Sequence, residues 1–408
     1  MEEWKEYKLG EILAEKGYIR GPFGSALKRG DMKSSGIPVY EQQHAIYQSR
    51  DFRFFIDDNK FNEMKRFQVQ ENDILISCSG TVGKVTIISK DDPKGIISQA
   101  LLTLRVNPKL ILPEYLKYFF TSQKGYNAII SRSSGSVQVN IAKRDVIEQI
   151  PINLPPLPTQ QKIAAILSSL DDKIELNNKI NENLEQQAQA LFKSWFVDFE
   201  PFGGKMPEDW NEIKVGTLPI YVSDYVANGS FADLKENVQL YQEENYAYFI
   251  RNTDLKNNSF NTYVDEHSYN FLEKSRLNGG ELIISNVGDV GSVYICPTLE
   301  KPMTLGNNII MLRCENEIYR YYLYMWFKWF EGKNRIHSIT GGSVLQKFNK
   351  TDFKNMLILE PSIHTLEQFE KMISPYFELI IQNTKQSQSL ANLRNVLLPK
   401  IMSGEIEV

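Results

Sequence analysis

The sequence has few of the residues that cross-linked and metal-stabilised proteins need. Among its 408 residues there are only three cysteines, Cys78, Cys296 and Cys314. Each lies within an apolar, strand-like segment, so buried thiols are expected and a disulfide framework is not. The four histidines show no ligand spacing with cysteine or aspartate, and no metal site is predicted.

Long hydrophobic runs are also missing. No run of about 18 apolar residues occurs, and the start MEEWKEYK is charged where a signal peptide needs an apolar core. We therefore expect a cytoplasmic protein without membrane contact. The apolar fraction of 42% still supports folded cores, and the length suits two domains with connecting elements.

The net charge of −4 argues against a protein that holds DNA by electrostatics alone. One segment, residues 16–33, is nevertheless basic, with Asp31 as its single acidic residue. Its basic residues are Lys16, Arg20, Lys28, Arg29 and Lys33. Such a patch is suited to DNA phosphates but is also typical of a solvated loop, and charge does not distinguish the two.

Signatures of common catalytic sites are absent. The chain has no acidic-Phe-x-Gly-x-Gly cofactor loop and no Asn/Asp-Pro-Pro-Tyr/Phe motif of amino methylation. Residues 153–156 (NLPP) do not match that motif, because the additional leucine displaces the amide from the prolines. Phosphate-loop, nucleophile-elbow and HExxH patterns are missing as well. We predict no catalytic residues.

The chain does contain an internal repeat. Residues 3–12 (EWKEYKLGEI) align with residues 209–218 (DWNEIKVGTL) at an offset of 206. Residues 73–87 align with residues 281–295 at an offset of 208, with seven identities in fifteen positions. Two copies of one unit imply a pseudo-symmetric molecule.

Each copy is predicted to be an α/β unit followed by a long helix. Short apolar segments bounded by turn residues predict strands at 37–40, 73–77, 84–88, 100–106, 248–250, 281–285, 292–296 and 308–313. Aromatic residues at helical spacing predict helices at 113–124 and around 319–330. The glycine segments 79–83 and 287–291 predict tight strand–turn–strand corners, with phosphate contact as a secondary role.

Proline-containing segments mark the start of each long helix. Thr159 and Thr365 are the predicted N-caps, and Pro375 predicts a kink or a later start of the second helix. We predict a first domain at 1–158, a first spacer helix at 159–200, a second domain at 201–363 and a second spacer helix at 364–408.

Residues at a spacing of seven predict how the helices pair. The first series is Ile163, Leu170, Asn177, Leu184 and Leu191, and the second is Phe369, Tyr376, Asn383, Leu390 and Leu397. Apolar residues around one central asparagine suggest a coiled coil in which Asn177 faces Asn383 and sets the register; separate packing of each helix on its own domain is the alternative. Parallel helices would separate the ends that the second unit must join by about 50 Å, so antiparallel pairing is expected. The predicted fold class is α+β, with two pseudo-symmetric α/β domains and two long antiparallel coiled-coil helices.

Polar residues follow matching strands in the two copies. Gln42, Gln43 and His44 correspond to Arg251, Asn252 and Thr253, while Ser98 and Gln99 correspond to Gly306 and Asn307. Glutamine, asparagine and arginine read adenine and guanine edges by paired hydrogen bonds. Taken singly, each of these residues is more often a surface loop residue than a base contact.

Four features together carry a family resemblance. They are the W-x-x-x-x-L/V-G starts at 4–10 and 210–216, the segment GPFGSALKRGD at 21–31, the repeated glycine corners, and the segment 154–196 with its degenerate partner at 359–401. With these features the chain resembles, over its whole length, the specificity subunit of type I restriction-modification systems. It departs from the pattern at 361–368, where PSIHTLEQ replaces the proline-rich helix start.

The resemblance implies two target recognition domains that read the halves of a bipartite double-stranded DNA target, about one helical turn apart. The helices would space the domains and dock two modification subunits, which would bind S-adenosylmethionine and flip an adenine for N6 methylation. Restriction subunits would add ATP- and magnesium-dependent cleavage, and this chain would carry no cofactor of its own. The predicted DNA contacts are Arg20, Lys28, Arg29, Gln42, His44, Arg251, Asn252 and Asn307.

Two other functions are compatible with parts of the sequence. A self-sufficient DNA methyltransferase would need a cofactor pocket, for which no motif is present. A structural coiled-coil scaffold would need no DNA preference, but it would leave the divergent loops on a repeated framework unexplained.

Overall fold

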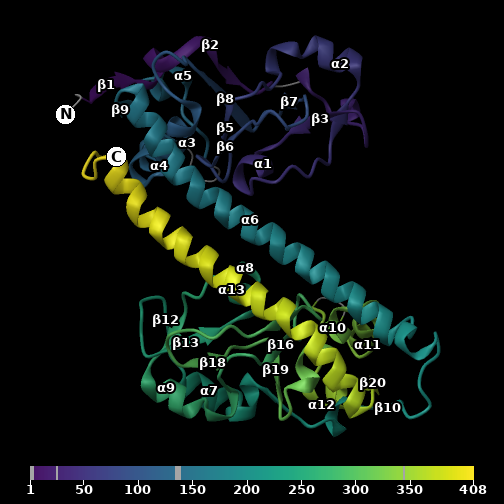
Figure 1. The fold of residues 1–408 in the computed structure, drawn as a ribbon. Helices are drawn as coiled ribbons and strands as arrows, with labels where there is room; N and C mark the ends of the chain where they lie inside the picture. The colour runs from purple at the N-terminus through teal and green to yellow at the C-terminus, as the bar shows by residue number, and fades with distance from the viewer. Residues whose placement is uncertain (1–3, 24–25, 134–138, 343–344) are drawn as a thin grey trace. The chain divides into compact units, whose positions relative to one another are not determined.

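The chain divides into two compact units in the computed structural model (Figure 1). Unit 1 comprises Met1–Asn177 and Thr384–Val408, and unit 2 comprises Asn178–Asn383. The structure describes residues 4–23, 26–133, 139–342 and 345–408. Glu3 of the first repeat segment and residues 24–25 of the GPFGSALKRGD segment lie outside the described residues.

Unit 1 is built around two small sheets. The first is antiparallel with the order β2-β8-β5-β6, formed by Leu13–Arg20, Leu101–Val106, Ile74–Ser77 and Val85–Ile87. The second has the order β4-β3-β7, formed by Phe55–Ile56, Ile37–Tyr40 and Ile96–Ile97, and its β3 and β7 are parallel. A separate pair joins β1 (Lys5–Lys8) to β9 (Pro151–Leu154).

Unit 2 repeats this plan. Its antiparallel sheet has the order β11-β19-β16-β17, formed by Ile220–Asp224, Ile309–Cys314, Leu282–Ser285 and Val293–Ile295. Its second sheet has the order β12-β14-β13-β18-β15, formed by Leu240–Tyr241, Tyr263–Val264, Ala247–Ile250, Met303–Leu305 and Arg276–Leu277. Strands β13 and β18 are parallel, as β3 and β7 are, and β10 (Asn211–Lys214) pairs with β20 (Leu357–Glu360). All eight predicted strands are confirmed.

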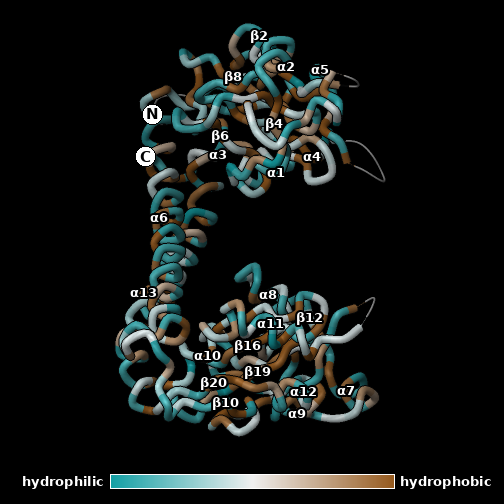
Figure 2. The backbone as a smooth tube through the Cα atoms, turned by 90° about the vertical axis from the view of Figure 1, so that its right-hand side faces the viewer, coloured by the Kyte–Doolittle hydropathy of each residue, from teal (hydrophilic) through white to brown (hydrophobic). Residues whose placement is uncertain are grey.

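The central strands are buried on both faces. In β5, Ile74 and Ile76 pack in a cluster with helix α3 (Pro113–Thr121), while Leu75 packs on the opposite side with Tyr40 and Ile97 of the second sheet. In β16, Leu282 and Ile284 likewise pack on one side and Ile283 packs on the other. Two-sided burial explains why these strands are continuous apolar runs without polar alternation, as the colours of β16 and β19 in Figure 2 show.

The predicted helix at 113–124 is in fact two helices, α3 and α4 (Gln123–Ile130). Ser122 between them has an extended backbone, and its Oγ accepts a hydrogen bond from the Gly125 N–H at 3.2 Å. A Cβ on Gly125 would lie 2.0 Å from the Phe119 carbonyl oxygen, so only glycine fits this corner. Unit 2 has the same break at Trp329, between α10 (Ile318–Lys328) and α11 (Phe330–Ser338). The periodicity of the aromatic residues did not reveal either corner.

Each unit also contains shorter α-helices. In unit 1 they are α1 (Gln42–Ile46), α2 (Asp58–Glu63) and α5 (Arg144–Ile147), and in unit 2 they are α7 (Phe231–Asn237), α8 (Asn252–Asn257), α9 (Glu266–Phe271) and α12 (Lys350–Asn355). Two of them, α1 and α8, directly follow the parallel strands β3 and β13. They therefore begin at equivalent places in the two repeats.

The two long helices are α6 (Leu157–Phe196) and α13 (Ile363–Met402). In unit 1, Asp171 of α6 contacts Arg394 at 2.6 Å while Asn177 contacts Gln386, so the residue numbers run in opposite directions. In unit 2, Asn181 contacts Asn383 and Phe192 lies against Phe369, which gives the same direction. The predicted antiparallel pairing is confirmed. No helix within the described ranges is long and apolar enough to cross a membrane.

Both long helices begin two residues before their predicted N-caps, Thr159 and Thr365. Helix α6 begins at Leu157, before Thr159, because a proline such as Pro158 is tolerated in the first turn, where its missing N–H needs no partner. Helix α13 begins at Ile363, and its cap is Ser362, whose Oγ accepts the Thr365 N–H at 3.3 Å. A later start at Pro375 is excluded, since α13 continues through that residue.

Candidate nucleic-acid interface

In unit 1, a polar edge forms where two parallel strands end. Parallel strands bring their carboxyl ends to the same edge of a sheet. Tyr40, the last residue of β3, is in register with Ile97 of β7, and its carbonyl oxygen accepts the Ser98 N–H at 2.8 Å. Gln42 follows on one strand and Gln99 on the other, so the edge carries amide side chains from both.

Unit 2 has the same edge with different side chains. Ile250 of β13 is in register with Leu305 of β18, and its carbonyl oxygen accepts the Gly306 N–H at 2.7 Å. Asn252 begins α8 after β13, and Asn307 follows β18 and is exposed. The predicted correspondence of Ser98 and Gln99 with Gly306 and Asn307 is confirmed by these two registers.

The other predicted correspondence is wrong by one residue. Since β3 ends at Tyr40 and β13 ends at Ile250, Gln42 corresponds to Asn252 and His44 corresponds to Asp254. The Glu41 N–H donates to His44 Nδ1 at 2.7 Å, and the Arg251 N–H donates to Asp254 Oδ2 at 2.9 Å. The two side chains therefore cap the first turn of equivalent helices. Histidine and aspartate are chemically unlike, so the sequence alone did not show that His44 and Asp254 are equivalent.

His44 belongs to the interior of unit 1. Its side chain has 0% exposure and lies against the rings of Tyr40 and Phe52, with centroid distances of 5.7 and 4.7 Å. Because Nδ1 accepts the Glu41 N–H, Nε2 carries the proton and donates to the Asp51 carbonyl oxygen at 3.1 Å. This geometry gives His44 a supporting role for α1, and its contact with DNA stays a prediction.

Gln42 and Asn252 share an unusual property. Both side chains are half-buried, and the carbonyl oxygens Gln42 Oε1 and Asn252 Oδ1 are buried with no hydrogen-bond partner within the described part of the chain. A buried acceptor without a donor costs free energy unless another group satisfies it. The exocyclic amino group of adenine is the kind of donor that asparagine and glutamine oxygens accept from. The same acceptor occurs at the same position of both repeats.

Arg251 is held in place by its own helix. Its guanidinium donates to Asp254 Oδ2 at 2.9 Å from Nε and to Oδ1 at 2.7 Å from Nη2. This hydrogen bonding with Asp254 raises the pKa of Arg251. The equivalent residue in unit 1 is Glu41, which pairs with Arg53 at 2.7 Å. The two edges therefore differ in charge at this position.

The basic segment of unit 1 packs on the sheet that carries Gln42. Leu27 and Met32 flank Lys28 and Arg29 in the chain and pack against the cluster of Val39 and Ile56. Lys28 and Arg29 are themselves exposed, and the Lys28 N–H donates to Asp31 Oδ2 at 2.8 Å. Arg20 is the last residue of β2 and is half-buried, with its guanidinium 5.7 Å from the Phe23 ring centroid.

A repeated ion pair supports each edge and was missed in the sequence. Arg105 contacts the buried Asp73 at 2.7 Å, and Arg313 contacts the buried Glu281 at 3.0 Å, at the same offset of 208. Arg105 Nη2 also donates to the Gln68 carbonyl oxygen, as Arg313 Nη2 does to that of Arg276. These bonds tie the large sheet to the segment beside the parallel strands. The sequence did contain a signal for this ion pair, since an acidic and a basic residue recur in both copies at the repeat offset of 208.

The predicted seam asparagines meet different partners from those expected. Asn177 Nδ2 donates to Gln386 Oε1 at 2.9 Å and to Ser387 Oγ at 3.2 Å, and Asn383 Nδ2 donates to Asn181 Oδ1 at 2.9 Å. Each partner lies about one turn beyond the predicted one. Side chains lean toward the N-terminus of their own helix, so facing residues of antiparallel helices lean in opposite directions.

Other chemistry has no support in the described residues. They contain no group of three histidine, cysteine, aspartate or glutamate side chains placed to hold a metal ion. Burial raises the pKa of the thiols of Cys78 and Cys314 to about 12, which keeps these cysteines protonated at neutral pH.

Comparison with known proteins agrees with this arrangement. The profile of the type I restriction modification DNA specificity domain matches residues 1–186 and again residues 207–392. The chain is 25% identical to the type I restriction enzyme HindI specificity subunit of Haemophilus influenzae, with both proteins covered completely. It is 28% identical to the type I restriction enzyme MjaIX specificity subunit of Methanocaldococcus jannaschii, over 83% of this chain and 81% of that protein.

A solved structure shares the fold. The S subunit of a type I restriction-modification system from M. genitalium superposes with a TM-score of 0.59 and 16% identity, over 98% of this chain and 96% of that one. The specificity-domain profile covers most of the chain, once per repeat. The chain therefore belongs to the family of type I restriction-modification DNA specificity subunits, non-catalytic proteins that recognise DNA targets for the methylase and restriction subunits.

Proposed function

We propose that the two repeats read the two halves of a bipartite double-stranded DNA target, each with its own strand-end edge. The domain at 1–158 reads one half and the domain at 201–363 reads the other. The helices at 159–200 and 364–408 hold them apart. Two modification subunits bind the helices and methylate adenine N6 within the target, and restriction subunits join the same complex.

One observation carries this proposal. The framework of the edge is repeated down to its backbone hydrogen bonds, whereas the side chains on it differ: Gln42 and Gln99 in one unit, Asn252 and Asn307 in the other. A constant framework with variable amide side chains is what two readers of different sequences need. Glu41 and Arg251 add opposite charges at equivalent positions.

We assign different roles to the amide and basic residues. Gln42, Asn252 and Asn307 contact base edges. Because the oxygens of Gln42 and Asn252 are buried in this structure, these two amides turn outward to accept from base amino groups. Arg20, Lys28 and Arg29 contact phosphates. Asp254 orients Arg251, which contacts either a phosphate or a base edge. His44 acts through α1, which it caps. Phosphate contacts set affinity and base contacts set sequence choice.

Methylome sequencing tests the proposal. Cells that express the chain with its modification subunit should show N6-methyladenine in a bipartite motif, and this motif should vanish when only this chain is deleted. Gln42→Ala should relax one position of one half-site, and Asn252→Ala one position of the other half-site. The exposed Gln70→Ala is the matched control. A motif that both variants relax in the same half-site would contradict the assignment of one domain to each half.

A further inference from the structure

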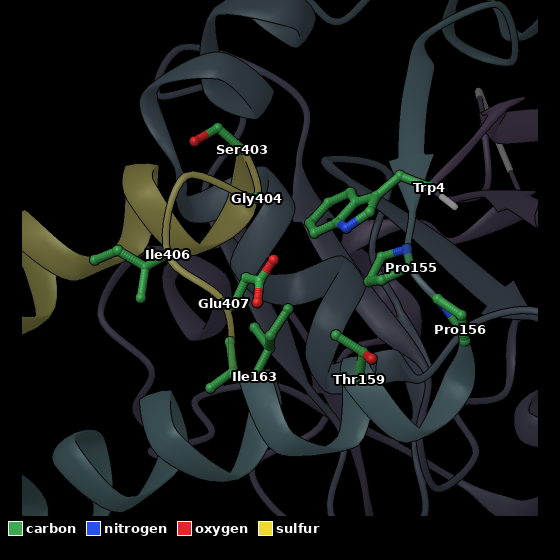
Figure 3. A pocket seen from close by; sticks show the side chains of 10 residues that line it. Trp4, Pro155, Pro156, Thr159, Ile163, Ser403, Gly404, Ile406 and Glu407 are labelled. Atoms are coloured by element: carbon green, nitrogen blue, oxygen red, sulfur yellow. The ribbon is translucent and has the colours of Figure 1, made fainter. Parts of the chain in front are cut away.

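A hollow of about 390 Å³ opens in unit 1 beside Trp4 (Figure 3). Three parts of the unit line it: Trp4 before β1, Pro155 before α6 together with Thr159 and Ile163 in its first turns, and the tail after α13 with Ile406 and Glu407. This site lies far along the chain from the polar edge and has no part in the proposed reading of DNA.

Unit 2 shows what occupies the equivalent place there. Trp210 corresponds to Trp4 at the offset of 206 and is only 3% exposed. Three phenylalanine rings from the end of α6 and the segment after it surround Trp210. They are Phe196, Phe199 and Phe202, with centroid distances to Trp210 of 5.6, 5.9 and 5.2 Å.

The same offset places non-aromatic residues in unit 1. Met402, Glu405 and Val408 correspond to Phe196, Phe199 and Phe202. Glu405 is exposed and lies 3.9 Å from Lys400, and the Val408 carbonyl oxygen accepts from Lys162 Nζ at 3.4 Å. The tail is therefore the counterpart of the unit 2 segment in sequence position, but it has no aromatic rings. Trp4 is half-buried, and the hollow beside it is lined by Val408, the counterpart of Phe202, and by Ile406.

The size and charge of the hollow define its occupant. A cavity of about 150 Å³ is enough to hold one benzene molecule, so the hollow has room for two aromatic rings. Glu407 lines it, and among the described residues its carboxylate has no hydrogen-bond or ion-pair partner. A basic residue between the two aromatic residues would match this carboxylate.

We propose that this hollow binds an extended segment of a partner protein that presents two aromatic side chains three positions apart, with a lysine or arginine between them. The two rings take the places that Phe199 and Phe202 take against Trp210 in unit 2. The inference is independent of the proposed function, because none of these residues belongs to the polar edges.

A synthetic peptide provides the test. The probe is the sequence of residues 197–204 with Glu200→Lys, carrying a fluorescent label, and anisotropy measures its binding to the full chain. The same peptide with Phe199→Ala and Phe202→Ala is expected to bind about tenfold more weakly or worse. The peptide with the natural glutamate should bind more weakly than the lysine peptide. High salt should reduce this difference in affinity, because it screens the charges.

Two variants of the protein locate the site. Thr159→Trp places a large ring at the wall of the hollow and should abolish peptide binding, whereas Gln161→Trp, at an exposed position of the same helix, should leave it unchanged. Glu405→Phe with Val408→Phe rebuilds the unit 2 cluster within the chain, so it should raise the melting temperature and also abolish binding.

Several outcomes would overturn the proposal. They are the absence of binding by the lysine peptide, equal binding by the alanine peptide, and unchanged binding to Thr159→Trp when that variant melts like the unmodified chain. Sedimentation separates a further case. If the chain is a dimer that the peptide dissociates, a second copy fills the hollow and a separate partner protein is excluded.

Discussion

Arg105 donates two hydrogen bonds to the fully buried Asp73, from Nε at 2.7 Å and from Nη2 at 2.9 Å. The pair joins the start of β5 to β8 and is repeated in unit 2 by Glu281 and Arg313. Burial raises the pKa of Asp73, and the bonds from Arg105 oppose this rise. Arg105 therefore stabilises the ionised form of the buried Asp73 carboxylate.

Removing that arginine should destabilise unit 1. Arg105→Met leaves Asp73 buried without its partner, so the free energy of unfolding of the full chain should fall by about 3–5 kcal/mol in urea denaturation. Asp73→Leu combined with Arg105→Met removes both charges and should recover much of the loss. Equal stability of Arg105→Met and the unmodified chain would show that the pair contributes nothing.

Glu370 of α13 should make the stability of unit 2 depend on pH. Burial, together with the nearby Glu378, raises the pKa of Glu370 to about 7 from its ordinary value of 4.5, against the opposing effect of Arg320. Since the folded pKa is higher than the unfolded one, the stabilisation is complete below pH 4.5 and is lost as the pH rises through about 7. Glu370→Gln should flatten the dependence of the urea midpoint on pH over this range. The exposed Glu367→Gln should retain it.

Lys28 should affect DNA affinity without affecting sequence choice. Lys28→Ala should weaken binding of the assembled complex equally for target and non-target DNA, and it should reduce the slope of log affinity against log salt by about one. Filter binding at several salt concentrations measures both quantities. Lys109→Ala, at another exposed position of unit 1, serves as the control. A change in the methylated motif of Lys28→Ala would contradict its role as a phosphate contact.

The long helices should determine the number of unread bases. Asn181 pairs with Asn383 and Asp171 with Arg394, so deletion of residues 178–184 together with residues 380–386 removes matched heptads. Seven helical residues span about 10 Å, which corresponds to about three base pairs of DNA. We expect the methylated motif to keep its half-sites and to change its spacer. An unchanged spacer in an active complex would rule out the helices as the spacing element.

Local patterns were sufficient for most elements of the fold. The eight predicted strands are present because Ile74–Ser77, Leu282–Ser285 and their neighbours are apolar segments bounded by turn residues, and such patterns act over a few positions. The repeat and the connectivity also predicted the antiparallel helices. The corners at Ser122 and Trp329 were missed, because an aromatic periodicity continues across each break. The signals were a glycine in the following turn, Gly125 or Gly332, and in unit 1 also the Ser122 hydroxyl.

The sequence by itself therefore determined the repeat, the strands, the paired helices and the family, all of which follow from spacing along the chain. Only the tertiary structure decided that His44 and Asp254 are equivalent caps, that Arg105 and Arg313 neutralise buried carboxylates, and that Trp4 lacks the rings around Trp210. These relationships join residues that are distant in sequence or unlike in chemistry. They depend on burial and on hydrogen-bond geometry, which exist only once the chain is folded.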